Sequence, residues 1–87
     1  MIFNMYSVRD SKAEAFMVPF TMHNDGVAIR AFADMVRDEN HAFSKNPEDY
    51  DLYYIGEFDD ELAAIYQKID NEEPVKLIYK GTAVPEK

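Results

Sequence analysis

The chain has 87 residues and no cysteine, and its 17 acidic residues against 9 basic ones give a formal net charge of −8. We expect a single domain over residues 1–87, because a chain this short fills one core, and the lack of cysteine excludes disulfide frameworks and thiolate zinc sites. The acidic balance argues against tight, non-specific nucleic-acid binding over the whole surface, since affinity for phosphates comes from Lys and Arg.

The first part of the chain predicts two strands. Residues 2–8 are rich in β-forming side chains and end at a polar turn, which is typical of a strand. Residues 15–22 alternate apolar side chains with period two, which also indicates a strand. Pro19 cannot donate a ladder hydrogen bond, so this second strand is expected at an edge of the sheet or broken at a bulge.

An amphipathic helix is predicted from Val27 to about Asn40. Its apolar residues recur at helical spacing, and Asn24 or Asp25 can accept hydrogen bonds from the N–H groups of its first turn. Phe32 lies on the apolar stripe and is expected to be buried. Its expected neighbours are Ile29 or Met35 on the helix and Phe16, Phe20 or Ile55 on the sheet.

A connection from Asn40 to Tyr50 follows, and Pro47 prevents a helix from running through it. Residues 51–58 predict a central strand, and their apolar side chains on both faces indicate that both faces are covered. Gly56 within this strand predicts a bulge or a close approach of another backbone segment.

The last third of the chain is less regular. Residues 62–69 fit either a short helix capped by Asp60 or the second arm of a hairpin, and the hairpin is favoured slightly. Residues 75–80 alternate as a final strand, and residues 82–87 are expected to form a loose tail. The predicted fold is therefore α+β, with one amphipathic helix packed on a small antiparallel sheet of about four to five strands.

We expect a soluble protein that does not catalyse a reaction. The N-terminus lacks the basic and apolar regions of a signal peptide, and no apolar run is long enough to span a membrane. His23 and His41 flank the predicted helix about 27 Å apart, too far to share a metal ion. We interpret the carboxylates at residues 59–61 as a solvent-exposed turn and not as a metal site. No metal, cofactor or catalytic residue is expected.

Binding is the alternative to catalysis, and large side chains are abundant. Six Phe, six Tyr and five Met are more than a core of this size hides, so we expect a homo-oligomer that associates through a strand or an uncovered sheet face. Tyr53 and Tyr54 could supply stacking surfaces for bases, and the competing interpretation places them in the core or in a subunit interface.

Three segments carry a resemblance to a known family. These are Tyr6–Ala13, the run Phe20–Asp34 and the run Phe43–Asp59 with its Asn-Pro-Glu-Asp-Tyr turn. Over residues 2–60 the chain resembles the small nonstructural protein, labelled DNA-binding, of gokushovirus-type microviruses, which are phages with a single-stranded DNA genome. Residues 61–87 contribute nothing to this resemblance.

The resemblance implies an accessory protein in the cytoplasm of the infected bacterial host, active in single-stranded DNA synthesis or packaging. It transfers no catalytic residue. Partners would be single-stranded DNA, bound directly, or phage replication or capsid proteins. An acidic, homo-oligomeric interaction module without nucleic-acid contact is the alternative. The cations in the resembling segments that could contact phosphates are Arg9, Lys12, Arg30, Arg37 and Lys45.

Overall fold

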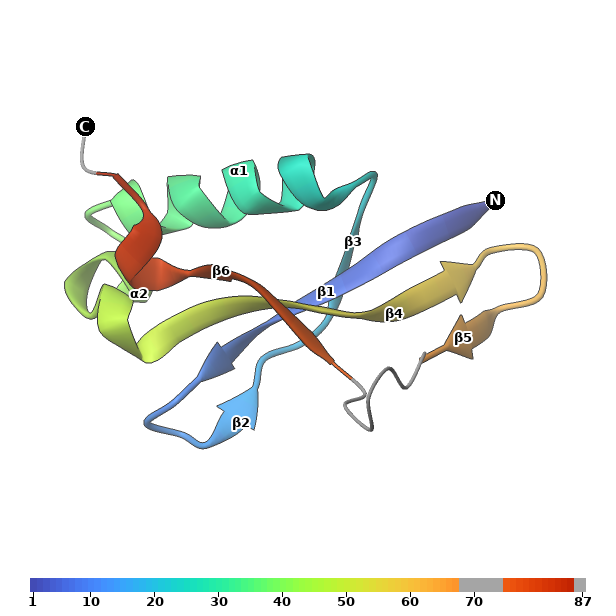
Figure 1. Ribbon diagram of the computed structural model, residues 1–87, viewed down its shortest axis with the longest axis horizontal. Helices are drawn as coiled ribbons and strands as arrows, with labels where there is room; N and C mark the ends of the chain where they lie inside the picture. The colour runs from blue at the N-terminus through green and yellow to red at the C-terminus, as the bar shows by residue number, and fades with distance from the viewer. Residues whose placement is uncertain (68–74, 86–87) are drawn as a thin grey trace.

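The computed structural model describes residues 1–67 and 75–85, and it shows a twisted antiparallel sheet with one long helix on one face (Figure 1). The strands are β1 (Ile2–Asp10), β2 (Ala15–Phe16), β3 (Phe20–Met22), β4 (Tyr50–Asp59), β5 (Ala64–Tyr66) and β6 (Lys76–Lys80). The helices are α1 (Asp25–Arg37), the short α2 (Ala42–Lys45) and the 3-10 turns η1 (Pro47–Asp49) and η2 (Gly81–Ala83).

Strands β1 and β4 form the centre of the sheet and pair along their whole length, from Ile2 opposite Asp59 to Asp10 opposite Tyr50. The free edge of β1 is shared by β2 and β3, and the free edge of β4 is shared by β6 and β5. All pairs are antiparallel. The sheet is therefore four strands wide at most, although it contains six strands.

The predicted count of four to five strands is wrong, because the sheet contains six strands. Strands also make up a larger share of the described chain than the predicted α+β fold implies. The predicted strand over residues 15–22 is two strands, because the chain leaves β1 at Pro19, which has no N–H to donate. The N–H of Met17 still bonds the carbonyl of Val8 at 2.8 Å, and pairing resumes at Phe20. The hairpin reading of residues 62–69 is confirmed at β5, while residues 68 and 69 lie outside the described residues.

Helix α1 begins at Asp25, two residues before the predicted start at Val27, and ends at Arg37, three residues early. The side-chain oxygen of Asn24 accepts the N–H of Val27 at 2.9 Å, as expected of a capping residue. At the other end, the Asp38 carboxylate accepts the N–H of Asn40 at 2.9 Å. This local hydrogen bond competes with the helical pattern, so the helix stops at Arg37.

The connection between α1 and β4 contains two helical turns that the sequence analysis did not anticipate. The Nδ1 atom of His41 accepts the N–H of Phe43 at 3.2 Å, which caps α2, and Phe43 is buried. Pro47 then occupies the start of η1, where a missing N–H costs nothing. Pro47 does prevent one continuous helix, as predicted.

The core lies between α1 and the sheet. Its buried members are Tyr6, Val8, Ala28, Phe32, Val36, Phe43 and Leu52. Phe32 is fully buried, as predicted, and Phe20, Ile29 and Met35 pack around the same cluster. Phe16, which was one expected neighbour, instead lies 43% exposed and stacks edge-on against Tyr53.

Two glycines allow segments distant in sequence to touch. At Gly56, the register between β1 and β4 shifts, and a Cβ atom would lie 2.3 Å from the carbonyl oxygen of Tyr66, so the predicted bulge and close approach are confirmed. At Gly81, a Cβ atom would lie 2.1 Å from the carbonyl oxygen of Pro47. Chain beyond β6 therefore packs on η1, and Val84, inside the expected tail, contacts the core.

Candidate nucleic-acid interface

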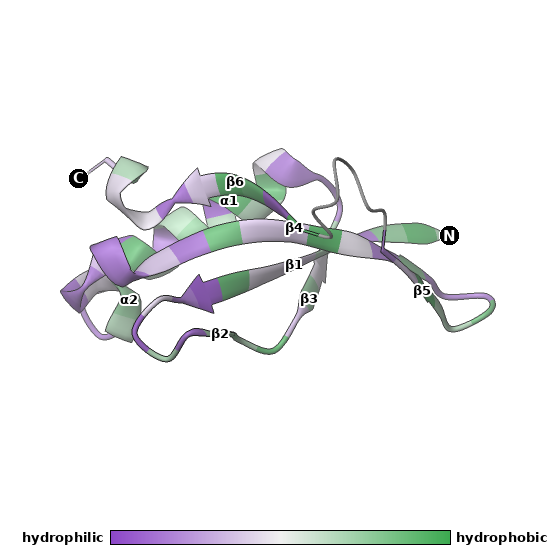
Figure 2. Cartoon of the chain, turned by 60° about the horizontal axis from the view of Figure 1, so that its bottom comes forward, coloured by the Kyte–Doolittle hydropathy of each residue, from purple (hydrophilic) through white to green (hydrophobic). Residues whose placement is uncertain are grey.

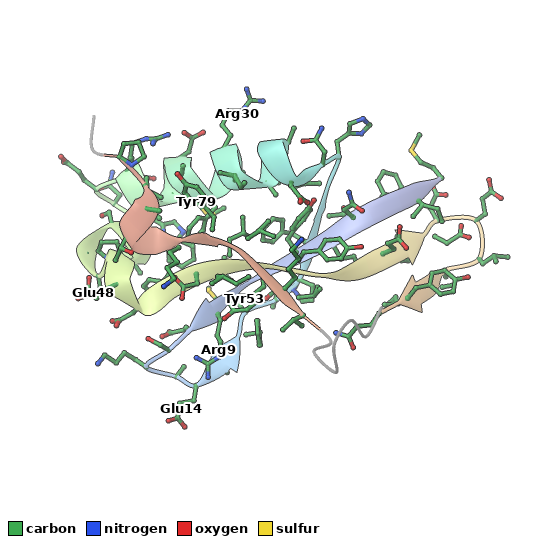
Figure 3. All side chains as sticks on the ribbon, in the orientation of Figure 1. Arg9, Glu14, Arg30, Glu48, Tyr53 and Tyr79 are labelled. Atoms are coloured by element: carbon green, nitrogen blue, oxygen red, sulfur yellow. The ribbon has the colours of Figure 1, made fainter. Side chains whose placement is uncertain are left out.

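One face of the sheet has no described helix or strand over it, and we call it the open face. Side chains alternate along a strand, so Tyr6, Val8 and Leu52 point toward α1 while Ser7, Arg9 and Tyr53 point the other way. Figure 3 shows Arg9 and Tyr53 on the side of the sheet away from α1, and Arg30 beyond the helix. By register, the open face carries Phe3, Met5, Ser7, Arg9, Phe16, Thr21, Asp51, Tyr53, Gly56, Phe58, Ile65, Leu77 and Lys80.

An aromatic pair, Phe16 and Tyr53, lies at one end of the open face. The ring centroids are 5.2 Å apart with an interplanar angle of 81°, an edge-to-face contact across β1. In register, Phe16 lies opposite Arg9 and Tyr53 lies opposite Ser7, so the two rings meet diagonally across β1. Ser7 is 1% exposed, and its hydroxyl donates to the carbonyl of Met17 at 2.7 Å, which holds the β2–β3 connection against the sheet.

The charge of the open face differs from that of the whole chain. One row across the sheet reads Phe16, Arg9, Asp51, Lys80, so two cations flank one carboxylate. The Asp51 carboxylate also accepts the N–H of Gly81 at 3.3 Å. The open face thus has a formal charge of +1 in a chain of net charge −8. Phosphate groups meet less repulsion there than on the rest of the surface.

The cations predicted to contact phosphate do not lie together. Arg9 is on the open face, and Lys12 lies beside it in the exposed turn between β1 and β2. Arg30 projects to solvent from α1, on the far side of the sheet (Figure 3). Arg37 is bound to Asp34 by a 3.1 Å ion pair on the same helix. Lys45 ends α2.

The two predicted tyrosines also separate. Tyr53 is on the open face, whereas Tyr54 packs edge-on against Tyr6 at 5.8 Å in the core. Burial, and then the charge of Glu57, raise the pKa of Tyr54 above its ordinary value of 10.0. Burial, together with a 2.6 Å hydrogen bond to Asp25, raises the pKa of Tyr6 further. Both tyrosine side chains therefore pack in the core and do not belong to the open face.

The sequence analysis missed Phe16, Leu77 and Lys80 as members of the site. Each is joined to Arg9 or Tyr53 through strand pairing, which depends on register between distant segments. Period-two alternation from Tyr53 would have excluded Tyr54 from the same face. No local pattern would have identified Phe16 as its partner.

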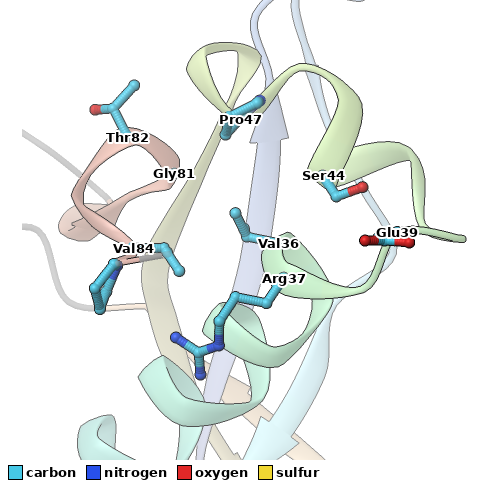
Figure 4. Close-up of a pocket in the computed structure, with 9 residues that line it drawn as sticks. Val36, Arg37, Glu39, Ser44, Pro47, Gly81, Thr82 and Val84 are labelled. Carbon is cyan, nitrogen blue, oxygen red and sulfur yellow. The ribbon is translucent and has the colours of Figure 1, made fainter. Parts of the chain in front are cut away.

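A separate feature is a pocket of about 480 Å³ between the end of α1 and the turns η1 and η2 (Figure 4). It is lined by Val36, Arg37, Glu39, Ser44, Pro47, Gly81, Thr82, Val84 and Pro85. Arg37 reaches it with its charge already met by Asp34, and Glu39 opposes an anion there. The open face therefore suits a nucleic acid better than this pocket does.

Neither feature holds a metal-ligand cluster within the described parts of the chain: residues 1–67 and 75–85 contain no group of three or more His, Asp or Glu side chains placed to bind an ion. Among the same residues, no helix has the length and apolar character needed to cross a membrane.

Comparison with known proteins identifies the family. The chain is 35% identical over 65 residues to Protein ORF5 of Chlamydia phage 1, a gokushovirus-type microvirus, and the match covers 70% of this chain and 68% of that protein. No solved structure matches the chain. The model of the family described as Phage ORF5 protein matches residues 3–84. The resemblance to small proteins of these phages is thereby confirmed, and the chain belongs to the Phage ORF5 protein family.

Proposed function

We propose that this phage accessory protein binds single-stranded DNA across its open face, in the cytoplasm of the infected bacterium, during genome synthesis or packaging. It acts by binding and not by catalysis. The observation that carries the proposal is the contact of the exposed Phe16 with the partly buried Tyr53, beside Arg9 on a sheet face that no described helix or strand covers.

The geometry of the pair suits unpaired bases. A base can stack on an exposed aromatic ring with a gain of about 1–3 kcal/mol, whatever its sequence. Arg9 and Lys80 lie in the row beside the rings, so the phosphates on either side of a stacked base have cations within the same region. Lys12 lies at the margin, in the turn that also carries Glu14 (Figure 3). Bases inside a duplex are already stacked, so the site favours single strands.

The charge of the protein limits the affinity. With about three cations neutralising phosphates, log Kobs for a single strand changes by about −2 for each tenfold rise in salt concentration. Raising salt from about 50 to about 200 mM would then weaken binding about 20-fold. The protein is expected to bind DNA only weakly unless several copies assemble on one strand.

The test is fluorescence anisotropy with a labelled oligothymidine of about 20 nucleotides at about 50 mM salt. Arg9→Ala and Arg30→Ala remove the same charge from opposite sides of the sheet, so they form a matched pair. Arg9→Ala should weaken binding about tenfold, and Arg30→Ala by less than about twofold, because its charge is screened over that distance. Tyr53→Leu should weaken binding about tenfold through lost stacking.

Two results would contradict this proposal. One is the absence of binding at low salt and high protein concentration, and the other is an equal loss with Arg30→Ala and Arg9→Ala. In either case a protein-contacting role becomes the better reading. One observation favours it: Ile2, Leu62 and Ile65 are all more than half exposed. A pull-down with the phage replication initiator or capsid protein, repeated with Leu62→Glu, would test it.

A further inference from the structure

The apolar character of the open face extends beyond the aromatic pair. Moving along β1 and β4 from Phe16 and Tyr53, the face carries Met5 and then Phe3 opposite Phe58. At its far end β5 adds Ile65, which is 67% exposed, and β6 adds Leu77 beside Tyr53, 39% exposed. Two stacked bases would leave much of this surface in contact with water. Figure 2, in which the bottom of the molecule in Figure 1 comes forward, shows hydrophobic and hydrophilic residues alternating along β4.

The charge of the open face indicates which kind of partner can bind it. Arg9, Lys80 and Asp51 give the open face a formal charge of +1. Because the whole chain has a net charge of −8, the residues outside the open face together carry −9. Two such chains repel wherever their acidic surfaces meet. The open face is the broad surface over which two copies approach with the least repulsion. A strongly acidic or strongly basic protein would find little charge complementarity there.

The two edges of the sheet are poorly suited to strand addition. On one edge, β2 and β3 contribute two and three residues and are separated by the break at Pro19. On the other edge, β6 begins and ends with Lys76 and Lys80, and β5 has only three residues. Short, interrupted and lysine-bearing edges resist pairing with another chain. A second copy therefore has better access to the face than to an edge.

The size of the molecule permits a dimer of this kind. Its extents are 39, 25 and 19 Å, so the rectangle that encloses the narrower of its two long faces, 39 by 19 Å, has an area of about 740 Å². A stable interface takes about 800 Å² of accessible surface from each partner, and accessible area exceeds projected area. The open face is thus large enough for a dimer at the lower end of the stable range.

We propose that a second copy of the chain covers the open face in an isologous dimer about a two-fold axis. A second part of this inference rests on the proposed function. Dimer formation and single-stranded DNA binding exclude one another, because both bury Phe16, Tyr53 and Leu77. The dimer is then the storage form of the free protein, and exposed viral DNA converts it to DNA-bound single copies.

Sedimentation equilibrium of the DNA-free protein tests the dimer by itself. The wild type should have a mass of about 20 kDa at high micromolar concentration and approach 10.1 kDa on dilution. Leu77→Glu places a carboxylate on the open face outside the core and should yield 10.1 kDa throughout. Ile65→Glu, on the same face, is the second disrupting variant, and circular dichroism checks that both variants are folded.

Leu62→Glu is the matched control, because Leu62 is 72% exposed in the β4–β5 turn, beyond the paired strands. It should remain dimeric. A wild type that is monomeric at every concentration overturns the proposal. So does a dimer that survives both Leu77→Glu and Ile65→Glu, or one that Leu62→Glu disrupts while Leu77→Glu does not.

Adding oligothymidine then tests the competition. The mass of the complex should correspond to separate protein copies along the strand. Ile65→Glu places its carboxylate at the far end of the open face from Arg9, Phe16 and Tyr53, so it should bind DNA more tightly than wild type wherever wild type is dimeric, because no dimer has to dissociate. A dimer that binds DNA intact would refute the competition. Absence of DNA binding would refute the proposed function and leave the DNA-free masses to decide the dimer.

Discussion

The hydroxyl of Tyr6 donates a 2.6 Å hydrogen bond to the carboxylate of Asp25, 19 residues away. This bond joins the middle of β1 to the first turn of α1. Tyr6 is fully buried, so the bond forms at the edge of the core and fixes where the helix begins to cross the sheet.

Tyr6→Phe keeps the ring and removes this bond. The free energy of unfolding should fall by about 1–2 kcal/mol, because hydrogen bonds to charged groups are stronger than neutral ones. Urea denaturation measures the change. Tyr79→Phe is the control: its hydroxyl donates to the carbonyl of Ala83 at an exposed site, and its loss should cost less than about 0.5 kcal/mol. Equal effects of the two variants would show that the Asp25 bond contributes nothing special.

Stability should decrease in alkaline solution. The pKa of Tyr6, Tyr50 and Tyr54 is raised in the folded chain, in each case mainly by burial, from an ordinary value of 10.0. Above pH 10 the unfolded chain loses these protons while the folded chain keeps them, so unfolding becomes easier as pH rises. Below pH 10 the contribution is complete and constant. Urea midpoints between pH 8 and pH 12 measure it.

In that titration Tyr6→Phe should show a shallower decrease than wild type above pH 10, because one of the three protons is no longer released on unfolding. A variant whose stability falls with the wild-type slope would indicate that Tyr6 does not hold its proton more tightly in the folded state.

Phe32→Ala should lower the free energy of unfolding by about 3–5 kcal/mol, because it leaves a cavity between α1 and the sheet. That is a large part of the stability of a domain this small. Phe16→Ala removes the same group from a half-exposed site and should cost about 1 kcal/mol. Thermal melting followed by circular dichroism compares them. If Phe32→Ala melts within a degree or two of wild type, the helix face has been assigned incorrectly.

Gly81→Ala should destabilise the protein by about 1–3 kcal/mol. Its Cβ atom would meet the carbonyl oxygens of Pro47 at 2.1 Å and Tyr50 at 2.4 Å, and neither backbone atom can rotate away. Gly26→Ala is the matched control, with one side-chain oxygen at 3.3 Å, and should change stability by less than about 1 kcal/mol. Two variants with the same melting temperature would contradict the packing of η2 on η1.

Local patterns were sufficient for the helix and for the central strands. The apolar spacing around Phe32 and the cap at Asn24 depend on neighbours within one or two turns, and both are present. The bulge at Gly56 was also visible, because a glycine inside an apolar strand has few other uses. The helix end at Arg37 was not, since it depends on a single side-chain bond from Asp38.

The candidate site was less accessible to sequence reasoning. Arg30 and Arg37 belong to α1, and this helix lies on the opposite side of the sheet from Arg9 and the open face. Phe16 meets Tyr53 through two strand pairings that join segments 37 residues apart. Composition correctly indicated spare aromatic side chains, and only register between strands reveals where they gather.

Ser7 has a consequence for how relatives of this protein can vary. It is buried opposite Tyr53 on the neighbouring strand, and its hydroxyl holds the carbonyl of Met17, the residue after Phe16. A larger residue at this position would push away the segment that carries Phe16 and so change the contact of Phe16 with Tyr53. Substitutions at positions 7, 16 and 53 should therefore be correlated in evolution, with a buried residue constraining the chemistry of an exposed surface.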